Sequence, residues 1–215
     1  MFIGHIGIGF AAKAYAPRGN LGTYLAAALL MDLIWPLFAI TGLEKLALLH
    51  GPVQVVGMEL LRYPWSHGLV FTLAWAGSVA GYHYGRFADR RVASTIAVAV
   101  TSHWLLDWIG HDGVMDIAPG VAPRVSAGLA YSTLALVAVE GGVFAVGLAW
   151  YLARTRATSA AGHWLLGSFM AAVLAIYAWS LTTFPQTADA VVLADLGGWL
   201  LVLWGWAVDR RRVAR

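Results

Sequence analysis

Long apolar stretches separated by short polar turns run along almost the whole chain. They do not alternate apolar and polar residues as membrane-barrel strands do, so they predict helices. About 20 apolar residues suffice to cross the hydrocarbon core of a membrane. The first stretch, roughly 21 Å long if helical, would cross only part of it, and the second opens with Asn20, a predicted helix cap. The seven predicted segments cover residues 2–15, 20–40, 63–85, 92–109, 126–153, 162–184 and 190–208.

The composition identifies an integral membrane protein. Of the 215 residues, 60% are hydrophobic and only 12% are charged, against about 25% charged residues in a soluble domain. We expect an all-α fold, a polytopic transmembrane helical bundle with six to seven membrane segments, formed as a single domain over residues 1–215. Cysteine is absent, which excludes disulfides, thiolate metal ligands and a cysteine nucleophile. The more polar stretch at 41–62 is expected to lie on the surface as short amphipathic pieces.

The basic residues fall mainly on one side of this arrangement. If every segment crosses, eleven of the 14 Lys and Arg residues lie on one side, and Lys45, Arg62 and Arg124 lie on the other. Cytoplasmic loops are the basic ones, so the N-terminus is predicted outside and the C-terminus inside a bacterial or archaeal cytoplasmic membrane. The basic clusters stand at helix ends as topology signals, which argues against a nucleic-acid partner. Membrane lipids surround such a bundle, and an oligomer is compatible with the sequence.

Five ionisable side chains lie inside apolar segments, near the predicted outer face. They are His5, Asp32, His67, His103 and Asp107. Chargeable groups are costly in hydrocarbon and usually face a protein interior or a water-filled cavity. A single buried His or Asp is often only a hydrogen-bonded packing residue, but five at one depth, from four helices, predict a metal site. Imidazole and carboxylate ligands suit a divalent transition metal, zinc first, with Mn and Fe as alternatives.

Further polar residues are candidates for the chemistry beside the ion. His111 continues the helix face of the last two ligands at a spacing of four residues. Together with Ser66 and Tyr131 it is predicted to contact substrate, although Ser in a membrane helix usually serves packing. Glu140 could be a ligand, a general base or a structural hydrogen-bonding group. Asp32 and Glu140 are the predicted catalytic carboxylates.

Four short stretches carry these residues: GHIGIGF, LLMDLIWP, PWSHGLVF and SHWLLDWIGHDG. Their order resembles the family of membrane-bound metal-dependent hydrolases, which includes small bacterial inner-membrane proteins under DNA-damage control. That family has an N-terminal His, an Asp late in the second helix, a Thr/Ser-His pair opening the next helix and then a His-x-x-x-Asp pair. The likeness spans roughly residues 1–115, which would form the metal-site half, while residues 116–215 would form supporting helices.

The resemblance and the depth of the site imply a hydrolase that uses metal-activated water on an amphiphilic ester or phosphoester at the outer leaflet. The chain departs from the family pattern at Met31, at Ile34 in place of a second acid, and at Arg62-Tyr63 in place of a His-Arg pair. A non-haem iron oxygenase or an isomerase would use the same ligands. An ion or proton transporter and a metal-stabilised scaffold protein are further alternatives. A transporter needs polar residues at all depths, and the inner half has few.

Overall fold

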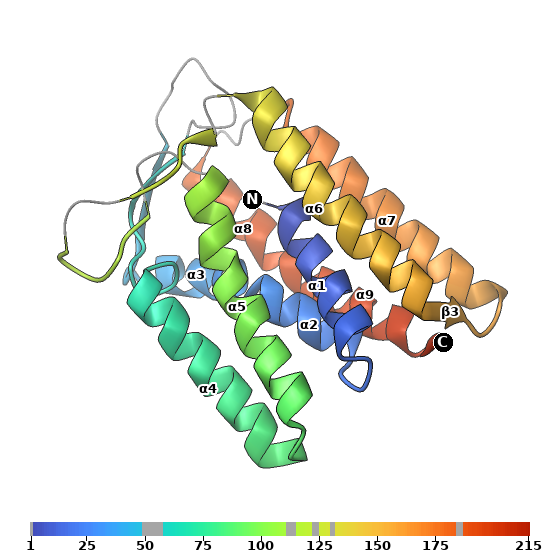
Figure 1. The fold of residues 1–215 in the computed structure, drawn as a ribbon. Helices are drawn as coiled ribbons and strands as arrows, with labels where there is room; N and C mark the ends of the chain where they lie inside the picture. Colours follow the sequence, from blue (N-terminus) through green and yellow to red (C-terminus); the bar gives the residue numbers. More distant parts are fainter. Residues whose placement is uncertain (1, 49–57, 111–114, 122–124, 130–131, 184–186) are drawn as a thin grey trace.

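The computed structural model describes residues 2–48, 58–110, 115–121, 125–129, 132–183 and 187–215. The fold is mainly helical, and most of the long helices run side by side in one bundle (Figure 1). The helices are α1 (Ile3–Tyr15), α2 (Leu21–Ala28), α3 (Leu30–Ile40), α4 (Leu69–Phe87), α5 (Arg90–Gly110), α6 (Thr133–Arg154), α7 (Ala160–Ser180), α8 (Ala188–Leu196) and α9 (Gly198–Asp209).

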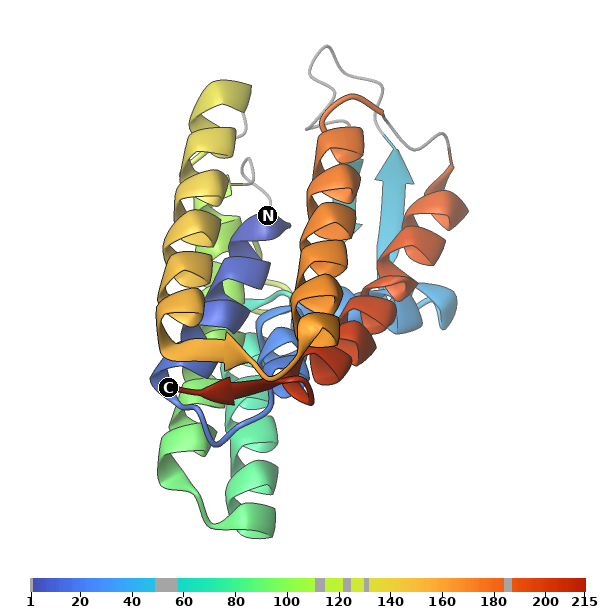
Figure 2. The same ribbon diagram turned by 90° about the vertical axis from the view of Figure 1, so that its right-hand side faces the viewer.

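The short first helix, α1, lies inside the bundle rather than at its rim (Figures 1 and 2). Ten of its 13 residues are buried, and it packs along α6 while also touching α2 and α5. A helix that is covered on most sides is apolar nearly all round. This explains why α1 has the composition of a membrane segment although it is too short to span one.

Glycines let α1 approach α6 at backbone distance. A Cβ added at Gly7 would lie 2.6 Å from Phe144 Cα and 2.7 Å from the Val143 carbonyl oxygen. A Cβ added at Gly147, on α6, would meet the backbone of Gly7. Only residues without a side chain allow two helices to pack so closely.

Gly7→Ala is therefore expected to destabilise the protein by about 1–3 kcal/mol, as overpacking of a close contact commonly does. Because His5 lies two residues away on α1, the same change should also displace that imidazole. Gly141→Ala on α6 is the matched control, since a Cβ there has open space around it. Thermal unfolding in detergent measures both variants, and equal melting temperatures would contradict this packing.

The second apolar segment forms two helices instead of one. The Asn20 side chain accepts a hydrogen bond from Gly22 N at 2.8 Å, which confirms the predicted cap. The chain breaks at Leu29, and α3 continues at an angle of 58° to α2. Within α3, Pro36 has no N–H to donate to the carbonyl of Asp32, four residues earlier. Asp32 lies in the first turn of α3, directly after the 58° bend between α2 and α3.

Among the described residues, four helical stretches are long and apolar enough to cross a membrane: α5, α6, α7 and Ala188–Asp209, which joins α8 and α9. The bent pair α2–α3 makes a fifth if it forms one span. The predicted six to seven spans are not confirmed. The reasons are that α1 has only 13 residues and that α4, with 19 residues, contains several glycines, two tyrosines, a histidine and an arginine.

Two short antiparallel sheets were not predicted. The strands are β1 (Lys45–Leu48) paired with β2 (Met58–Arg62), and β3 (Thr155–Ala157) paired with β4 (Arg212–Ala214). The first pair lies within the stretch at 41–62 that the sequence assigned to amphipathic surface pieces. The second pair ties the chain after α6 to the chain after α9.

Candidate metal centre

The predicted metal ligands come from four separate parts of the fold. His5 lies on α1, Asp32 in the first turn of α3, and His103 and Asp107 on successive turns of α5. His67 lies in the turn that precedes α4, not inside a helix as the sequence predicted. The site therefore depends on packing between α1, α3 and α5 and on one tight turn beside them.

The side chains of all five residues meet in two groups that share His103. One group is His5, His103 and Asp107, and the other is Asp32, His67 and His103; the possible ligand atoms within each group lie within 4.8 Å of one another. His103 Nε2 is 3.1 Å from Asp107 Oδ2 and 3.5 Å from Asp32 Oδ1. His5 Nε2 is 3.2 Å from Asp107 Oδ1. His67 Nε2 is 3.4 Å from Asp32 Oδ1 and 3.9 Å from Asp107 Oδ2.

These spacings match the distances between ligands of one small ion. Two ligands placed about 2.0–2.1 Å from zinc at the tetrahedral angle lie about 3.4 Å apart. Four of the five nitrogen–oxygen distances fall between 3.1 and 3.5 Å. The spacing of the donor atoms is therefore compatible with ligands of an ion, although two of these contacts, His5 Nε2 to Asp107 Oδ1 and His67 Nε2 to Asp32 Oδ1, are also hydrogen bonds.

The tautomer of His103 leaves one ring nitrogen facing the carboxylates. His103 Nδ1 lies 2.7 Å from the carbonyl oxygen of Ala28, the last residue of α2. A carbonyl only accepts, so Nδ1 carries the hydrogen, and Nε2 of the neutral ring has the lone pair. That Nε2 atom is buried and makes no hydrogen bond with any described residue, although Asp107 Oδ2 is 3.1 Å away. Metal-bound histidines are commonly fixed in this way by a backbone carbonyl.

The ring of His5 stacks on that of His103. The two planes differ by 4°, and their centroids are 3.9 Å apart. Two imidazolium rings at this distance in a buried place would repel each other. The arrangement thus disfavours a positive charge on both rings at once, and a ring that is neutral is in the form that binds metals.

Of the five candidate ligands, only Asp32 has a side chain that is partly exposed. His5 and His103 are fully buried, and His67 and Asp107 are nearly so. The side chain of Asp32 is 33% exposed. A molecule that approaches the centre therefore meets Asp32 first.

Glu44 is a buried carboxylate beside the site that sequence reasoning missed. It follows α3, and its Oε1 accepts hydrogen bonds from Trp65 N at 2.9 Å and Ser66 N at 2.8 Å. Its Oε2 accepts one from the Ser66 hydroxyl at 2.7 Å. Burial raises the pKa of the Glu44 carboxyl above its ordinary value, and the hydrogen bonds from Ser66 offset part of that shift. A raised folded-state pKa means that the stability Glu44 contributes falls as pH rises through that pKa.

Ser66, a predicted substrate contact, is fully buried behind His67. Its oxygen lies 2.8 Å from His67 Nδ1, so the hydroxyl joins Glu44 to one of the candidate metal ligands. Its role toward substrate stays a prediction. The other two predicted substrate contacts, His111 and Tyr131, lie outside the described residues.

Glu140 lies at the edge of the centre and is not part of either ligand group. It is buried on α6, and its Oε2 accepts a hydrogen bond from Gly4 N at 3.3 Å, in the first turn of α1. A carboxylate at a helix N-terminus satisfies an unpaired N–H and favours the helix dipole. This hydrogen bond gives Glu140 a structural role, one of the three roles that the sequence left open. It holds the start of α1 against α6, next to His5. A catalytic role for Glu140 stays a prediction.

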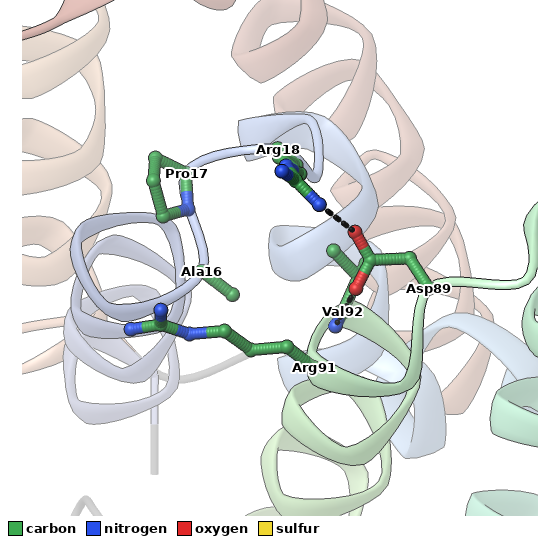
Figure 3. A pocket seen from close by; sticks show the side chains of 6 residues that line it. All are labelled: Ala16, Pro17, Arg18, Asp89, Arg91 and Val92. Atoms are coloured by element: carbon green, nitrogen blue, oxygen red, sulfur yellow. Dashed lines mark hydrogen bonds and ion pairs between the residues drawn. The ribbon is translucent and has the colours of Figure 1, made fainter.

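A hollow at the other end of α5 has a structural explanation (Figure 3). Arg18 Nη1 lies 3.7 Å from Asp89 Oδ2, and Asp89 Oδ1 accepts a hydrogen bond from Val92 N at 3.1 Å. That backbone hydrogen bond, helped by Arg18, holds the pKa of Asp89 below its ordinary value. Arg91 donates to the Tyr15 carbonyl. These contacts fix the turn after α1 against the start of α5, away from the end of α5 that carries the ligands.

No protein-family model, curated protein or solved structure matches this chain. The likeness to membrane-bound metal-dependent hydrolases therefore rests on the four sequence stretches and stays an expectation. The geometry does not depend on that likeness. Buried histidines and aspartates that are distant in the sequence lie together and could hold a metal ion.

Proposed function

We propose that this protein is an integral-membrane hydrolase that uses one divalent transition-metal ion, zinc, to activate water. The observation that carries the proposal is the buried Nε2 atom of His103. It lies 3.5 Å from Asp32 Oδ1 and 3.1 Å from Asp107 Oδ2, and its lone pair has no hydrogen-bond donor among the described residues. A nitrogen lone pair and two carboxylates that converge in a largely buried place would repel one another unless a proton or a metal ion lies between them, and the proposal assigns the metal ion to this position.

A single ion accounts for both ligand groups more simply than two ions. His103 Nε2 belongs to both groups and has one lone pair, so it binds one ion at a time. Asp32, His67 and Asp107 would complete a set of four donors, and His5 could add a fifth. Zinc accepts nitrogen and oxygen donors in tetrahedral sites and can expand to five ligands.

The residues around the ion would divide the work of hydrolysis. A zinc ion supplies a Lewis acid and lowers the pKa of water toward neutrality. Asp32 is the carboxylate that reaches the surface of the centre, so its oxygen that does not bind the ion is the proposed general base that takes up the proton. The buried His103 and Asp107 would hold the ion, and water would be excluded on their side.

We place the centre near the outer face of a bacterial or archaeal cytoplasmic membrane, with the N-terminus outside and the C-terminus inside. The support is the charge asymmetry: the basic turns at Arg18 and Arg90-Arg91 lie at the opposite end of α5 from Asp107. A site at this depth would suit an amphiphilic ester or phosphoester whose chain stays among the lipids.

Zinc-loaded protein in lipid bilayers is expected to hydrolyse a chromogenic ester or phosphoester with a long alkyl chain. A chelator should abolish the activity, and added zinc should restore it. Asp32→Asn keeps a donor oxygen but takes up no proton, so kcat should fall by about 100-fold or more. A short-chain, water-soluble ester is the matched substrate for testing the amphiphile preference. Protein that binds zinc but cleaves neither ester nor phosphoester would contradict the proposed reaction.

A non-haem iron enzyme is the second candidate. The group of Asp32, His67 and His103 contains two histidines and one carboxylate, which is also the ligand set of many Fe(II) oxygenases. Iron would give a coloured or paramagnetic centre and oxygen-dependent turnover, whereas zinc is silent in both respects. Metal analysis with electron paramagnetic resonance on protein purified under nitrogen distinguishes the two.

A further inference from the structure

Behind His67 lies a buried chain of hydrogen bonds that the proposed zinc chemistry does not itself use. Glu44 Oε1 accepts from two backbone N–H groups, and Glu44 Oε2 accepts from the Ser66 hydroxyl at 2.7 Å. On the other side of that hydroxyl, His67 Nδ1 lies at 2.8 Å. Glu44 is 3% exposed and Ser66 is fully buried. The chain is therefore shielded from solvent along its whole length.

The directions of these hydrogen bonds follow from what each atom can do. An ionised carboxylate only accepts, so the single hydroxyl hydrogen of Ser66 points to Glu44. The Tyr63 carbonyl, which could also accept from that hydroxyl, is more distant at 3.5 Å. The Ser66 oxygen is then an acceptor toward the ring, and it favours the tautomer with hydrogen on His67 Nδ1. In that tautomer the lone pair is on Nε2.

This tautomer is the one that serves the centre. His67 Nε2 faces Asp32 Oδ1 at 3.4 Å, on the same side as the other donor atoms. In the metal-free protein, the longer contact with Asp32 would favour hydrogen on Nε2, whereas the 2.8 Å contact with Ser66 favours it on Nδ1. The shorter and better-buried contact should decide between them.

We propose that Glu44 is a positioning residue which, through Ser66, fixes His67 in the tautomer that presents Nε2 to the metal ion. The consequence for metal binding rests on the proposed function, but the tautomer is a property of the metal-free protein and can be measured without an ion. Outer partners of metal-bound histidines have this effect generally, and their loss costs about 10–100-fold in metal affinity. Glu44 thus does for His67 what the Ala28 carbonyl does for His103.

Glu44→Gln tests the proposal with little change of shape. The Gln amide oxygen must take the place of Oε1, because the amide NH2 group cannot face the N–H groups of Trp65 and Ser66. The amide nitrogen then faces the Ser66 oxygen and donates to it. The Ser66 hydrogen is released toward His67 Nδ1, which favours the opposite tautomer with hydrogen on Nε2. Both backbone contacts of residue 44 survive, so a role confined to holding the turn is unaffected.

The readout is the ¹⁵N spectrum of metal-free protein labelled at histidine, recorded with the rings neutral and assigned with the His67→Asn variant. The expected result is an Nδ1–H ring at His67 in the wild type and an Nε2–H ring in Glu44→Gln. Zinc affinity, measured by competition with a chelating dye, should fall about 10–100-fold in the variant. An unchanged His67 tautomer in Glu44→Gln would overturn the proposal.

Two further variants complete the design. Ser66→Ala removes the connecting hydroxyl, so adding Glu44→Gln to it should have no further effect on zinc affinity. An additive loss in the double variant would show that Glu44 acts by another route. Glu140→Gln is the matched change of a second buried glutamate, and it should leave the His67 tautomer as in the wild type. A wild type that shows the expected tautomer but binds no zinc would overturn the proposed function while leaving the positioning role of Glu44 intact.

Discussion

Asp107→Ala is expected to remove the bound ion from this protein. Asp107 is 2% exposed, and its two carboxylate oxygens face different histidines, His5 through Oδ1 and His103 through Oδ2. Loss of an outer partner of a metal ligand already costs about 10–100-fold in affinity. Loss of a direct ligand that touches both sides of the centre should therefore cost more than about 100-fold. Zinc titration against a chelating dye measures this change.

The same variant distinguishes a site that binds an ion from a cluster of buried polar side chains that binds none. An ion at 100 times its dissociation constant stabilises the folded state by about 2.7 kcal/mol. Added zinc should therefore raise the melting temperature of the wild type and leave that of Asp107→Ala unchanged. Asp189→Ala, which removes an exposed carboxylate from the first turn of α8, should respond to zinc as the wild type does. A zinc-induced shift of equal size in Asp107→Ala would contradict the assignment of the ligands.

Lys13→Met is expected to cause the largest loss of stability away from the centre. Lys13 is buried in the last turn of α1, and its Nζ lies 2.8 Å from Asp209 Oδ1. It also donates to the carbonyls of Pro17 and Gly19, both at 2.9 Å. Removal of one partner from a buried ion pair leaves an uncompensated charge and costs about 3–5 kcal/mol. Met keeps the length of the side chain, so packing is nearly preserved.

Two comparisons make the Lys13 result specific. Adding Asp209→Asn to Lys13→Met should recover part of the loss, because the unpaired carboxylate is then gone. Arg18→Met removes a cation whose side chain is 88% exposed and whose nearest carboxylate oxygen is 3.7 Å away. Exposed pairs of this kind contribute little, so its melting temperature should stay close to that of the wild type. Equal losses of stability in Lys13→Met and Arg18→Met would contradict the prediction that the buried Lys13–Asp209 ion pair stabilises the fold more than the exposed Arg18–Asp89 pair.

The five candidate metal ligands could be predicted from the sequence because burial of charge in hydrocarbon is so costly. His5, Asp32, His67, His103 and Asp107 were selected by depth alone, and the structure brings all five into two groups of ligands. Depth along a helix follows directly from residue number. The i, i+4 spacing likewise places His103 and Asp107 on one face of α5.

The partners of these ligands could not be predicted because they depend on long-range packing. Glu44 lies in a stretch that was assigned to the surface, and no periodicity indicates that its carboxylate turns inward to Ser66. The hydrogen bond from Gly4 N to Glu140 joins residues 136 positions apart, so a depth count gives no sign of it. An acidic residue immediately after a membrane-length segment is the one signal that could have singled out Glu44.

The helix boundaries differ from the prediction for local reasons. The break at Leu29 interrupts a continuous apolar run without any Gly or Pro at that position, so hydrophobicity alone joins α2 and α3. The start of α4 is delayed to Leu69 because the backbone of Gly68 is extended, with φ −66° and ψ 140°, and separates the turn that begins at Tyr63 from the helix. Because of this delay, His67 lies in a turn before α4, and helix periodicity does not predict where its side chain points.

Elemental analysis of the purified, zinc-loaded protein shows whether the five side chains bind an ion, with the wild type measured beside His103→Ala and His163→Ala. His103 belongs to both ligand groups, whereas His163 is an exposed residue of α7. We expect about one zinc ion per chain in the wild type and in His163→Ala, and close to none in His103→Ala. The same zinc content in all three proteins, or no zinc in the wild type, would contradict this expectation.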